Sequence, residues 1–125
     1  MLGEQIGTLS GHKVAVGSLN FINEGHHLVS LGYDQTIKVW DANQWRELQT
    51  IQLNVAGVRG MVLSPNEKLA AISMESKVQL WLVAEWRLQA ELPISTKAVG
   101  GMAFSPDGRW LAVGAANKKI RIWKF

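Results

Sequence analysis

The stretch GYDQTIKVWD, residues 32–41, decides the fold of this 125-residue chain. A polar turn leads into residues that alternate between polar and apolar, and a tryptophan followed by an aspartate ends the run. Such alternation is typical of a β-strand with one buried face. His12 and Ser30 precede the aspartate of the turn, Asp34. These three residues raise two alternatives, a catalytic constellation or a part of the architecture.

The same pattern occurs three times along the chain. Each copy has a turn, a short apolar strand, a second polar turn and an alternating strand that ends in tryptophan: NEGHHLVSLGYDQTIKVWD, PNEKLAAISMESKVQLWL and PDGRWLAVGAANKKIRIWK. The strand-ending tryptophans are Trp40, Trp81 and Trp123, which are 41 and 42 residues apart. Another apolar strand precedes each copy: VAVGSLNF, GVRGMVLS and AVGGMAFS. Repetition at this period indicates a repeat architecture.

Each copy predicts four strands. In the first copy the expected strands cover residues 14–22, 27–32, 36–41 and 45–51. No segment shows the apolar period of a helix, so the chain is predicted to be all-β. In SPDG, residues 105–108, the proline presets φ and the glycine tolerates a left-handed backbone, which predicts a hairpin turn. The corresponding SPNEK lacks the glycine and predicts a less ideal turn.

A four-stranded unit that repeats about every 40–45 residues and ends in Trp-Asp is typical of one propeller blade. Gly11-His12, Ser30, Asp34 and Trp40-Asp41 in this order and spacing, together with FSPDG at 104–108, resemble the WD-repeat β-propeller family. The resemblance covers the whole chain and implies three four-stranded blades. Their expected ranges are 11–52, 53–93 and 94–125. Residues 1–10 would be a seam strand, the outermost strand of a blade whose other strands come from the far end of the chain.

His12, Ser30 and Asp34 could form a catalytic triad or a structural network. A triad needs an exposed nucleophile, a base within reach and oxyanion donors. Ser30 is instead expected inside the apolar strand LVSLG, without a strand-to-helix elbow to display it. In the family, matching residues form a buried hydrogen-bonded tetrad with the blade tryptophan, here Trp40. Buried indole and carboxylate groups both need partners, so the structural tetrad is favoured and an enzyme is not expected.

The other two copies lack this set of residues. Counting back from Trp81 and Trp123, the serine position holds Ala71 and Val113, the aspartate position Glu75 and Asn117, and the histidine position Asn54 and Ser95. Replacing a whole buried polar network by apolar groups can be nearly neutral, whereas losing one member costs about 1–3 kcal/mol. We therefore expect the second and third blades to keep their tryptophans without the network, and Glu75 to reach solvent.

Composition argues against several other kinds of site. The chain has no cysteine, which excludes disulfides, thiolate metal sites and a cysteine nucleophile. His26 and His27 are adjacent where a strand should begin, so their side chains diverge and no metal or cofactor is expected. The net charge of +3 and the cluster Lys118, Lys119 and Arg121 favour a solvated edge over a nucleic-acid surface. No signal peptide or long apolar run occurs, so no membrane partner and a cytoplasmic location are expected.

Three blades are fewer than a closed propeller contains, which is typically about 4–8. An open arc would expose the apolar faces of its end blades, and the sequences of those blades are no more polar than the middle copy. Head-to-tail association with itself would close the ring. A homodimer with six blades is favoured, and a homotrimer with nine is the alternative. A second explanation is that the chain is a segment of a longer propeller.

Propellers of this kind are mostly rigid platforms that bind proteins or peptides across their top face. The resemblance therefore implies a non-enzymatic protein-interaction scaffold with an unknown protein or peptide as its partner. A self-assembling structural unit or a fragment of a longer propeller, without a ligand of its own, is the alternative. The positions assigned to the top face are small and apolar, with Lys13 and Tyr33 as the clear anchors. They are Lys13, Ala15, Tyr33, Val55, Gly57, Met74, Thr96, Ala98 and Ala116.

Overall fold

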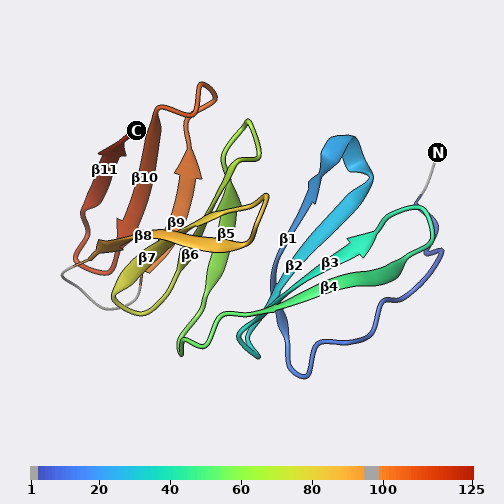
Figure 1. Ribbon diagram of the computed structural model, residues 1–125. Helices are drawn as coiled ribbons and strands as arrows, with labels where there is room; N and C mark the ends of the chain where they lie inside the picture. The colour runs from blue at the N-terminus through green and yellow to red at the C-terminus, as the bar shows by residue number, and fades with distance from the viewer. Residues whose placement is uncertain (1–2, 95–98) are drawn as a thin grey trace.

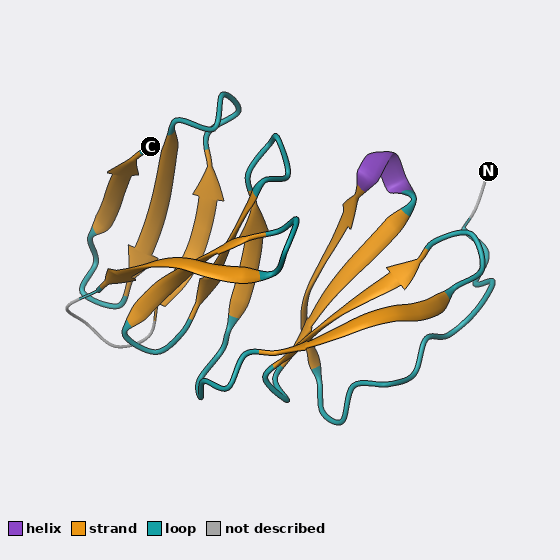
Figure 2. Ribbon diagram, in the orientation of Figure 1, coloured by secondary structure: helices purple, strands orange, loops and turns teal. Residues whose placement is uncertain are grey.

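The computed structural model describes residues 3–94 and 99–125 of the chain. Three antiparallel sheets follow one another in chain order and lie side by side (Figure 1). Within the described residues, the only helical element is a single 3-10 turn, η1 (Asn23–Gly25), in the first hairpin (Figure 2). The all-β prediction is confirmed.

The first sheet is a four-stranded meander in the order β1-β2-β3-β4. Its strands are β1 (Val16–Ile22), β2 (His27–Gly32), β3 (Thr36–Asp41) and β4 (Arg46–Gln52). Every boundary lies within two residues of the predicted range. Alternation of polar and apolar residues located β1 and β3 because one face of each packs on an apolar layer, whereas β4 contributes only Ile51 to that layer.

The second sheet repeats this arrangement and the third stops one strand short. The second contains β5 (Gly60–Leu63), β6 (Leu69–Ser73), β7 (Lys77–Leu82) and β8 (Arg87–Pro93). The third contains β9 (Val99–Phe104), β10 (Trp110–Ala115) and β11 (Ile120–Lys124), in the order β11-β10-β9. Within the part of the chain that the structure describes, β11 therefore pairs on one side only. Residues 3–10 form no strand there.

The core consists of two apolar layers, one on each side of the second sheet. The first layer joins the first and second sheets through side chains such as Leu31, Ile37 and Ile72, which are fully buried. The second layer joins the second and third sheets and includes Val78 and Leu111. Burying each such side chain contributes about 1.5–3 kcal/mol. Among residues 3–94 and 99–125, only the second sheet has an apolar layer on both faces.

Strand register defines which residues of the three sheets correspond. Leu28 pairs with Trp40, Ala70 with Trp81, and Leu111 with Trp123. Going two residues further along each of these strands, Ser30 corresponds to Ile72 and to Val113. Counting back from the tryptophan had assigned Ala71 to the serine position, which is wrong by one residue. The turn between β6 and β7 is one residue shorter than its counterpart between β2 and β3, so the count was displaced.

The two turns that begin with Ser-Pro have the same hydrogen bonds. Gly108 N–H donates to the Ser105 carbonyl at 2.9 Å, and Glu67 N–H donates to the Ser64 carbonyl at 2.8 Å. Both donors have a left-handed backbone, with φ of +74° at Gly108 and +62° at Glu67. A side chain is strained in this region whereas glycine is not. The turn at Glu67 is thus formed normally, but by a residue that fits it less well.

Candidate functional site

Four side chains from different segments of the first sheet are joined by hydrogen bonds. Trp40 Nε1, from β3, donates to Ser30 Oγ, in β2, at 2.9 Å. Ser30 Oγ lies 2.6 Å from His12 Nε2, which comes from the segment before β1. His12 Nδ1 lies 3.3 Å from Asp34 Oδ1, in the turn after β2. One chain of donors satisfies all three contacts, running from the indole to the hydroxyl, then to the imidazole and then to the carboxylate.

Asp34 is the charged end of this network and is held as a carboxylate. Its Oδ1 accepts the Thr36 hydroxyl at 2.6 Å, and its Oδ2 accepts the Lys13 backbone N–H at 3.0 Å. Burial raises the pKa of Asp34, but the hydrogen bonds from Thr36, Lys13 and His12 outweigh it and lower the pKa to about 2. Sequence reasoning missed Thr36, although a threonine two residues after a turn aspartate is a typical partner for it.

The network has the geometry of a cross-link between three segments. Ser30 is only 2% exposed, and its oxygen is already occupied by the indole and the imidazole. A serine nucleophile needs an accessible oxygen and donors for an oxyanion beside it. Here the polar atoms instead satisfy one another, and they hold His12 and the turn at Asp34 against the strands.

The second sheet satisfies its tryptophan in a different way. Trp81 Nε1 donates to Gln79 Oε1, two residues earlier on the same strand, at 3.0 Å. Gln79 is buried, and its amide group donates to Glu91 Oε2 at 2.8 Å. As expected, this blade keeps its tryptophan without the serine of the network, but the indole has a polar partner, Gln79, that the sequence did not predict. As expected, Glu75 is exposed.

Apolar side chains occupy the positions of Ser30 and Gly32 in the second sheet. Ile72 corresponds to Ser30 by register, and Met74, two residues further on, corresponds to Gly32. A Cβ on Gly32 would collide with the His12 imidazole and the Asp34 carboxylate, so the first sheet needs glycine there. Met74 has a side chain at this position and is 2% exposed, within the layer between the first two sheets.

The third sheet keeps the tryptophan and the turn but not the serine. Val113 at the serine position is fully buried, and Trp123 packs, partly buried, against the layer beneath the second sheet. Asn117 Oδ1 accepts the Lys119 N–H at 3.2 Å, just as Asp34 Oδ1 accepts the Thr36 N–H at 3.2 Å. This turn therefore has the same geometry with a neutral residue.

Most of the described top-face positions are at the surface. Lys13, Ala15, Gly57 and Ala116 are exposed, Tyr33 is 49% exposed and Val55 is partly buried. The assignment of Met74 to the top face was wrong, because its side chain is buried in the core and cannot contact a partner. The short turn before β7 moves it from the expected turn position to the end of β6. Thr96 and Ala98 lie outside the described residues.

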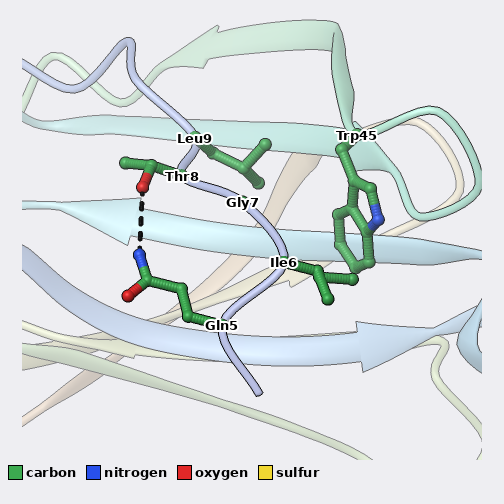
Figure 3. Close-up of a pocket in the computed structure, with 6 residues that line it drawn as sticks. All are labelled: Gln5, Ile6, Gly7, Thr8, Leu9 and Trp45. Carbon is green, nitrogen blue, oxygen red and sulfur yellow. Dashed lines mark hydrogen bonds between the residues drawn. The ribbon is translucent and has the colours of Figure 1, made fainter.

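A shallow hollow lies elsewhere, at the N-terminal segment. It has a volume of about 380 Å³ and is lined by residues 5–9 and by Trp45, which precedes β4. Ile6 and Trp45 face each other across it, and Gln5 Nε2 donates to Thr8 Oγ1 at 3.3 Å (Figure 3). No charged side chain lines this hollow, so it lacks the convergent polar groups of a small-molecule site.

Metal-ligand and membrane signals are absent from residues 3–94 and 99–125. No cluster of three histidine, cysteine, aspartate or glutamate side chains is present in these ranges. His26 Nδ1 lies 2.7 Å from the Asn23 carbonyl oxygen within its own turn. These ranges also contain no helix long and apolar enough to span a bilayer.

Comparison with known families gives two matches along the chain. The family profile described as "WD domain, G-beta repeat" matches residues 3–41 and 86–124, which together are more than half of the sequence. The chain belongs to the WD-repeat family. The two matched stretches have equal length, so Trp40 takes the position of Trp123, and residues 4–10 take that of β8.

Known proteins with similar sequences match over about half of this chain. "Nuclear distribution protein PAC1" of Arthroderma benhamiae is 35% identical over 71 residues, covering 50% of this chain and 15% of that protein. "Lissencephaly-1 homolog 1" of Paramecium tetraurelia is 35% identical over 52 residues, covering 42% and 13%. "WD repeat-containing protein 89 homolog" of Dictyostelium discoideum is 35% identical over 74 residues, covering 49% and 21%. The matched region is thus a small part of each relative.

Proposed function

We propose that this WD-repeat chain is a non-enzymatic scaffold that binds a protein or peptide across its top face. WD repeats imply a protein-interaction role for the chain as a whole. The use of the top face for this binding is our proposal. The observation that carries it is a fixed, exposed aromatic side chain, Tyr33, at the junction of the first two sheets.

Tyr33 is held in place although half of its surface is free. Its backbone N–H donates to the Ala15 carbonyl at 3.0 Å. Its ring lies so close to Gly17 that a Cβ on that glycine would come within 2.7 Å of it, and within 3.2 Å of the Arg59 carbonyl oxygen. A rigid exposed aromatic loses little entropy on binding and is enriched among residues that dominate protein interfaces. Lys13, fixed by its backbone to Asp34, adds a cation to the proposed face.

The test is binding to peptides selected on the purified chain from a displayed library. The double variant Tyr33→Ala/Lys13→Ala should weaken binding of the selected peptides about tenfold or more. The matched control is Leu88→Ala/Lys124→Ala, an exposed apolar and cationic pair on other elements, which should bind as the unaltered chain does. Equal binding by both double variants would contradict the assignment to the top face.

We also propose that the chain associates head to tail with copies of itself. The observation in favour is that, among the residues that the structure describes, the third sheet has three strands where the others have four. Residues 4–10 correspond to β8, a fourth strand, yet form no strand in their own chain. Such a segment can complete the sheet of a second copy by pairing with β11.

Light scattering on a sizing column tests this association. A mass of about twice the 13.8 kDa of one chain supports a six-bladed dimer, and about three times supports a nine-bladed trimer. A folded species that stays at the mass of one chain at all concentrations would overturn the association. The top-face proposal would survive that result, because its residues come from one chain.

A further inference from the structure

We infer that one face of the first sheet docks on the opposite face of the third sheet in a second copy, with Leu19 and Trp45 as the anchors. The inference rests on the proposed association and assigns its contact surface. We call the outward face of the first sheet the front face, and define it by Leu19, Phe21 and Trp45. The outward face of the third sheet is the back face, defined by Ala112, Ile120 and Ile122.

Leu19 occupies a position that packs in an apolar layer in the other two sheets. It pairs with Ser30, whereas Met61 pairs with Ile72 and Met102 with Val113, so the three residues correspond. Met61 is 5% exposed in the layer between the first two sheets, and Met102 packs in the second layer. Leu19 is 61% exposed. Since the position is apolar in all three sheets, we infer that a preceding sheet covers it.

Trp45 and Trp86 are a second pair of corresponding residues, next to the outermost strands, of which one is buried and the other is exposed. Each immediately precedes the outermost strand of its sheet and has a left-handed backbone, with φ of +53° and +47°. Trp86 is 8% exposed and lines a hollow together with His27 and Val39 of the first sheet. Trp45 is 39% exposed. Trp45 lines a hollow with only residues 5–9 of its own chain, at the place where Trp86 meets a neighbouring sheet.

The back face carries the complementary surface. Ile120 and Ile122 correspond by register to Val78 and Leu80 of the second sheet, and to Ile37 and Val39 of the first. These four counterparts are at most 6% exposed, whereas Ile120 is 73% and Ile122 58% exposed. A hollow at this face is lined only by glycine, alanine, methionine and isoleucine, from β9, β10 and residue 120. Exposed apolar surface of this kind marks an interaction site.

A second copy is the occupant that these observations favour. The chain already forms this contact twice, between its first and second and between its second and third sheets. On the front face, Leu19 corresponds to a residue that docks in both cases, and Trp45 to one that docks in the first case only. The back face has the counterparts of the residues that receive them. Docking one on the other repeats an interface that the chain already forms, as closed rotational assembly requires.

One internal contact predicts which atoms meet between copies. Ser18 Oγ donates to the Met61 carbonyl at 2.9 Å, from the first sheet to the second. Gly101 precedes Met102 as Ser18 precedes Leu19, so Gly101 takes the place of Ser18 on the back face. In a second copy, Leu19 takes the place of Met61. Gly101 of one copy and Leu19 of another should therefore be neighbours.

Cross-linking tests this pair directly because the chain has no cysteine of its own. Leu19→Cys and Gly101→Cys are made in separate chains, mixed, and treated with a short bismaleimide. The new side chain at 101 fits, since a Cβ there meets no atom within 4 Å. We expect a covalent pair that only the mixture forms in high yield. Asn23→Cys/Glu67→Cys in one chain is the positive control and should link internally, because these two surface residues of neighbouring sheets are in contact. Leu88→Cys mixed with Gly101→Cys is the negative control.

Absence of the covalent pair above the Leu88→Cys control would overturn the inferred surface. If light scattering still shows a multiple of the single-chain mass, the association stands and only this surface is wrong. If the chain stays single, both proposals fail together. A linked pair that forms equally with the Leu88→Cys control would also count against the surface, because it would be indiscriminate.

A second measurement tests Leu19 and Trp45 by substitution and follows self-association without cross-linking. Leu19→Ser and Trp45→Ala should each weaken self-association about tenfold or more, as expected for central apolar anchors. Leu88→Ser removes a comparably exposed leucine from β8 and should leave association unchanged. Far-UV circular dichroism confirms that each variant is folded. Unchanged association in both anchor variants would overturn their assignment.

Discussion

Ser30 connects two groups that have little access to water. Its oxygen accepts the Trp40 indole N–H at 2.9 Å and lies 2.6 Å from His12 Nε2. Ser30→Ala leaves both polar groups buried without this partner, which costs about 1–3 kcal/mol. We expect that loss in the free energy of unfolding, measured by urea denaturation. Ser10→Ala, at an exposed serine, should cost little.

A double-mutant cycle shows whether the loss comes from the network. Trp40→Phe removes the indole donor, so Ser30→Ala should cost less in that background. If the two substitutions are additive, the serine and the tryptophan act independently and the role proposed for the network is wrong.

Asp34 makes the stability of the first sheet depend on pH. Its pKa is about 2 in the folded chain, below the ordinary value of 3.8. A carboxyl group with a lowered pKa stabilises the fold in full above its unfolded value, and this contribution is lost as the pH falls from about 4 to about 2. Asp34→Asn should therefore be less stable than the unaltered chain at about pH 6, and the difference should shrink at about pH 2.5.

Urea denaturation at both pH values measures this difference. Asp107→Asn is the control: Asp107 also accepts a hydroxyl, from Ser105, and has a lowered pKa, but it lies at an exposed turn. A difference between Asp34→Asn and the unaltered chain that does not change with pH would show that the charge of Asp34 is not what stabilises the turn.

The sequence could suggest the residues of this network but not their substitutes. The spacing of His12, Ser30, Asp34 and Trp40 follows a known pattern, and the structure places all four within hydrogen-bond distance of a neighbour in the set. The partner of Trp81 was missed because it lies two residues away on the same strand. No repeat pattern marks such a glutamine, since it replaces a residue that belongs to another strand.

At the scale of elements, the Ser-Pro turns depend on one left-handed residue. Gly108 has a φ of +74° there. Gly108→Ala keeps the turn's hydrogen bonds but forces a Cβ into this region, which costs about 1 kcal/mol. Thermal or urea unfolding measures the loss. Gly100→Ala is the matched control, because its φ is not left-handed and its Cβ would make an ordinary contact at 3.6 Å.

Equal stability of the two glycine variants would mean that the turn relaxes around the new side chain. Glu67 at the corresponding position already shows that a side chain is tolerated. Its carboxylate offsets part of the strain, because Oε1 accepts the Asn23 N–H of the first sheet at 3.0 Å. The methyl group that Gly108→Ala introduces cannot accept such a hydrogen bond, so its strain is not offset in this way.

Strands were predictable from alternation, whereas turn lengths were not. Strands that pack one face on an apolar layer have apolar residues at every second position, and this alternation can be recognised in the sequence. The turn between β6 and β7 is polar at either length, and its missing residue changes no pattern. That single residue moved Met74 from the expected surface into the core, and Ala71 out of the serine position.

At the scale of the molecule, the three sheets form an arc, and within the described part of the chain only the middle sheet has an apolar layer on both faces. Neither outward face could be assigned to an occupant from composition, because leucine, isoleucine and tryptophan occur at both covered and uncovered positions. Register was needed to show that Leu19 and Ile122 correspond to buried residues. The sequence predicted the repeats and the uncovered ends; the structure identifies the residues on each face.

Because the sheets are covered by apolar layers to different extents, their backbone amides should be protected from hydrogen exchange to different extents. Val78 and Leu80 of β7 are at most 3% exposed, and β7 pairs with strands on both sides. Ile120 and Ile122 of β11 are more than half exposed, and β11 pairs on one side among the described residues. Local opening is easiest where few apolar contacts hold a strand. Amide hydrogen exchange followed by mass spectrometry should therefore be slow in β6 and β7 and much faster in β11.

Dependence on concentration makes this measurement decisive for the association. Dilute chains should exchange rapidly throughout β11, because half of its amides point to an open edge. If a second copy adds a strand there, protection of β11 should rise with concentration while β6 and β7 stay unchanged. Uniform exchange in all three sheets at low concentration would contradict the uneven cover itself. Rapid exchange of β11 at every concentration would instead leave the arc intact and remove the added strand, since an edge that pairs with another chain must become protected as the pairing forms.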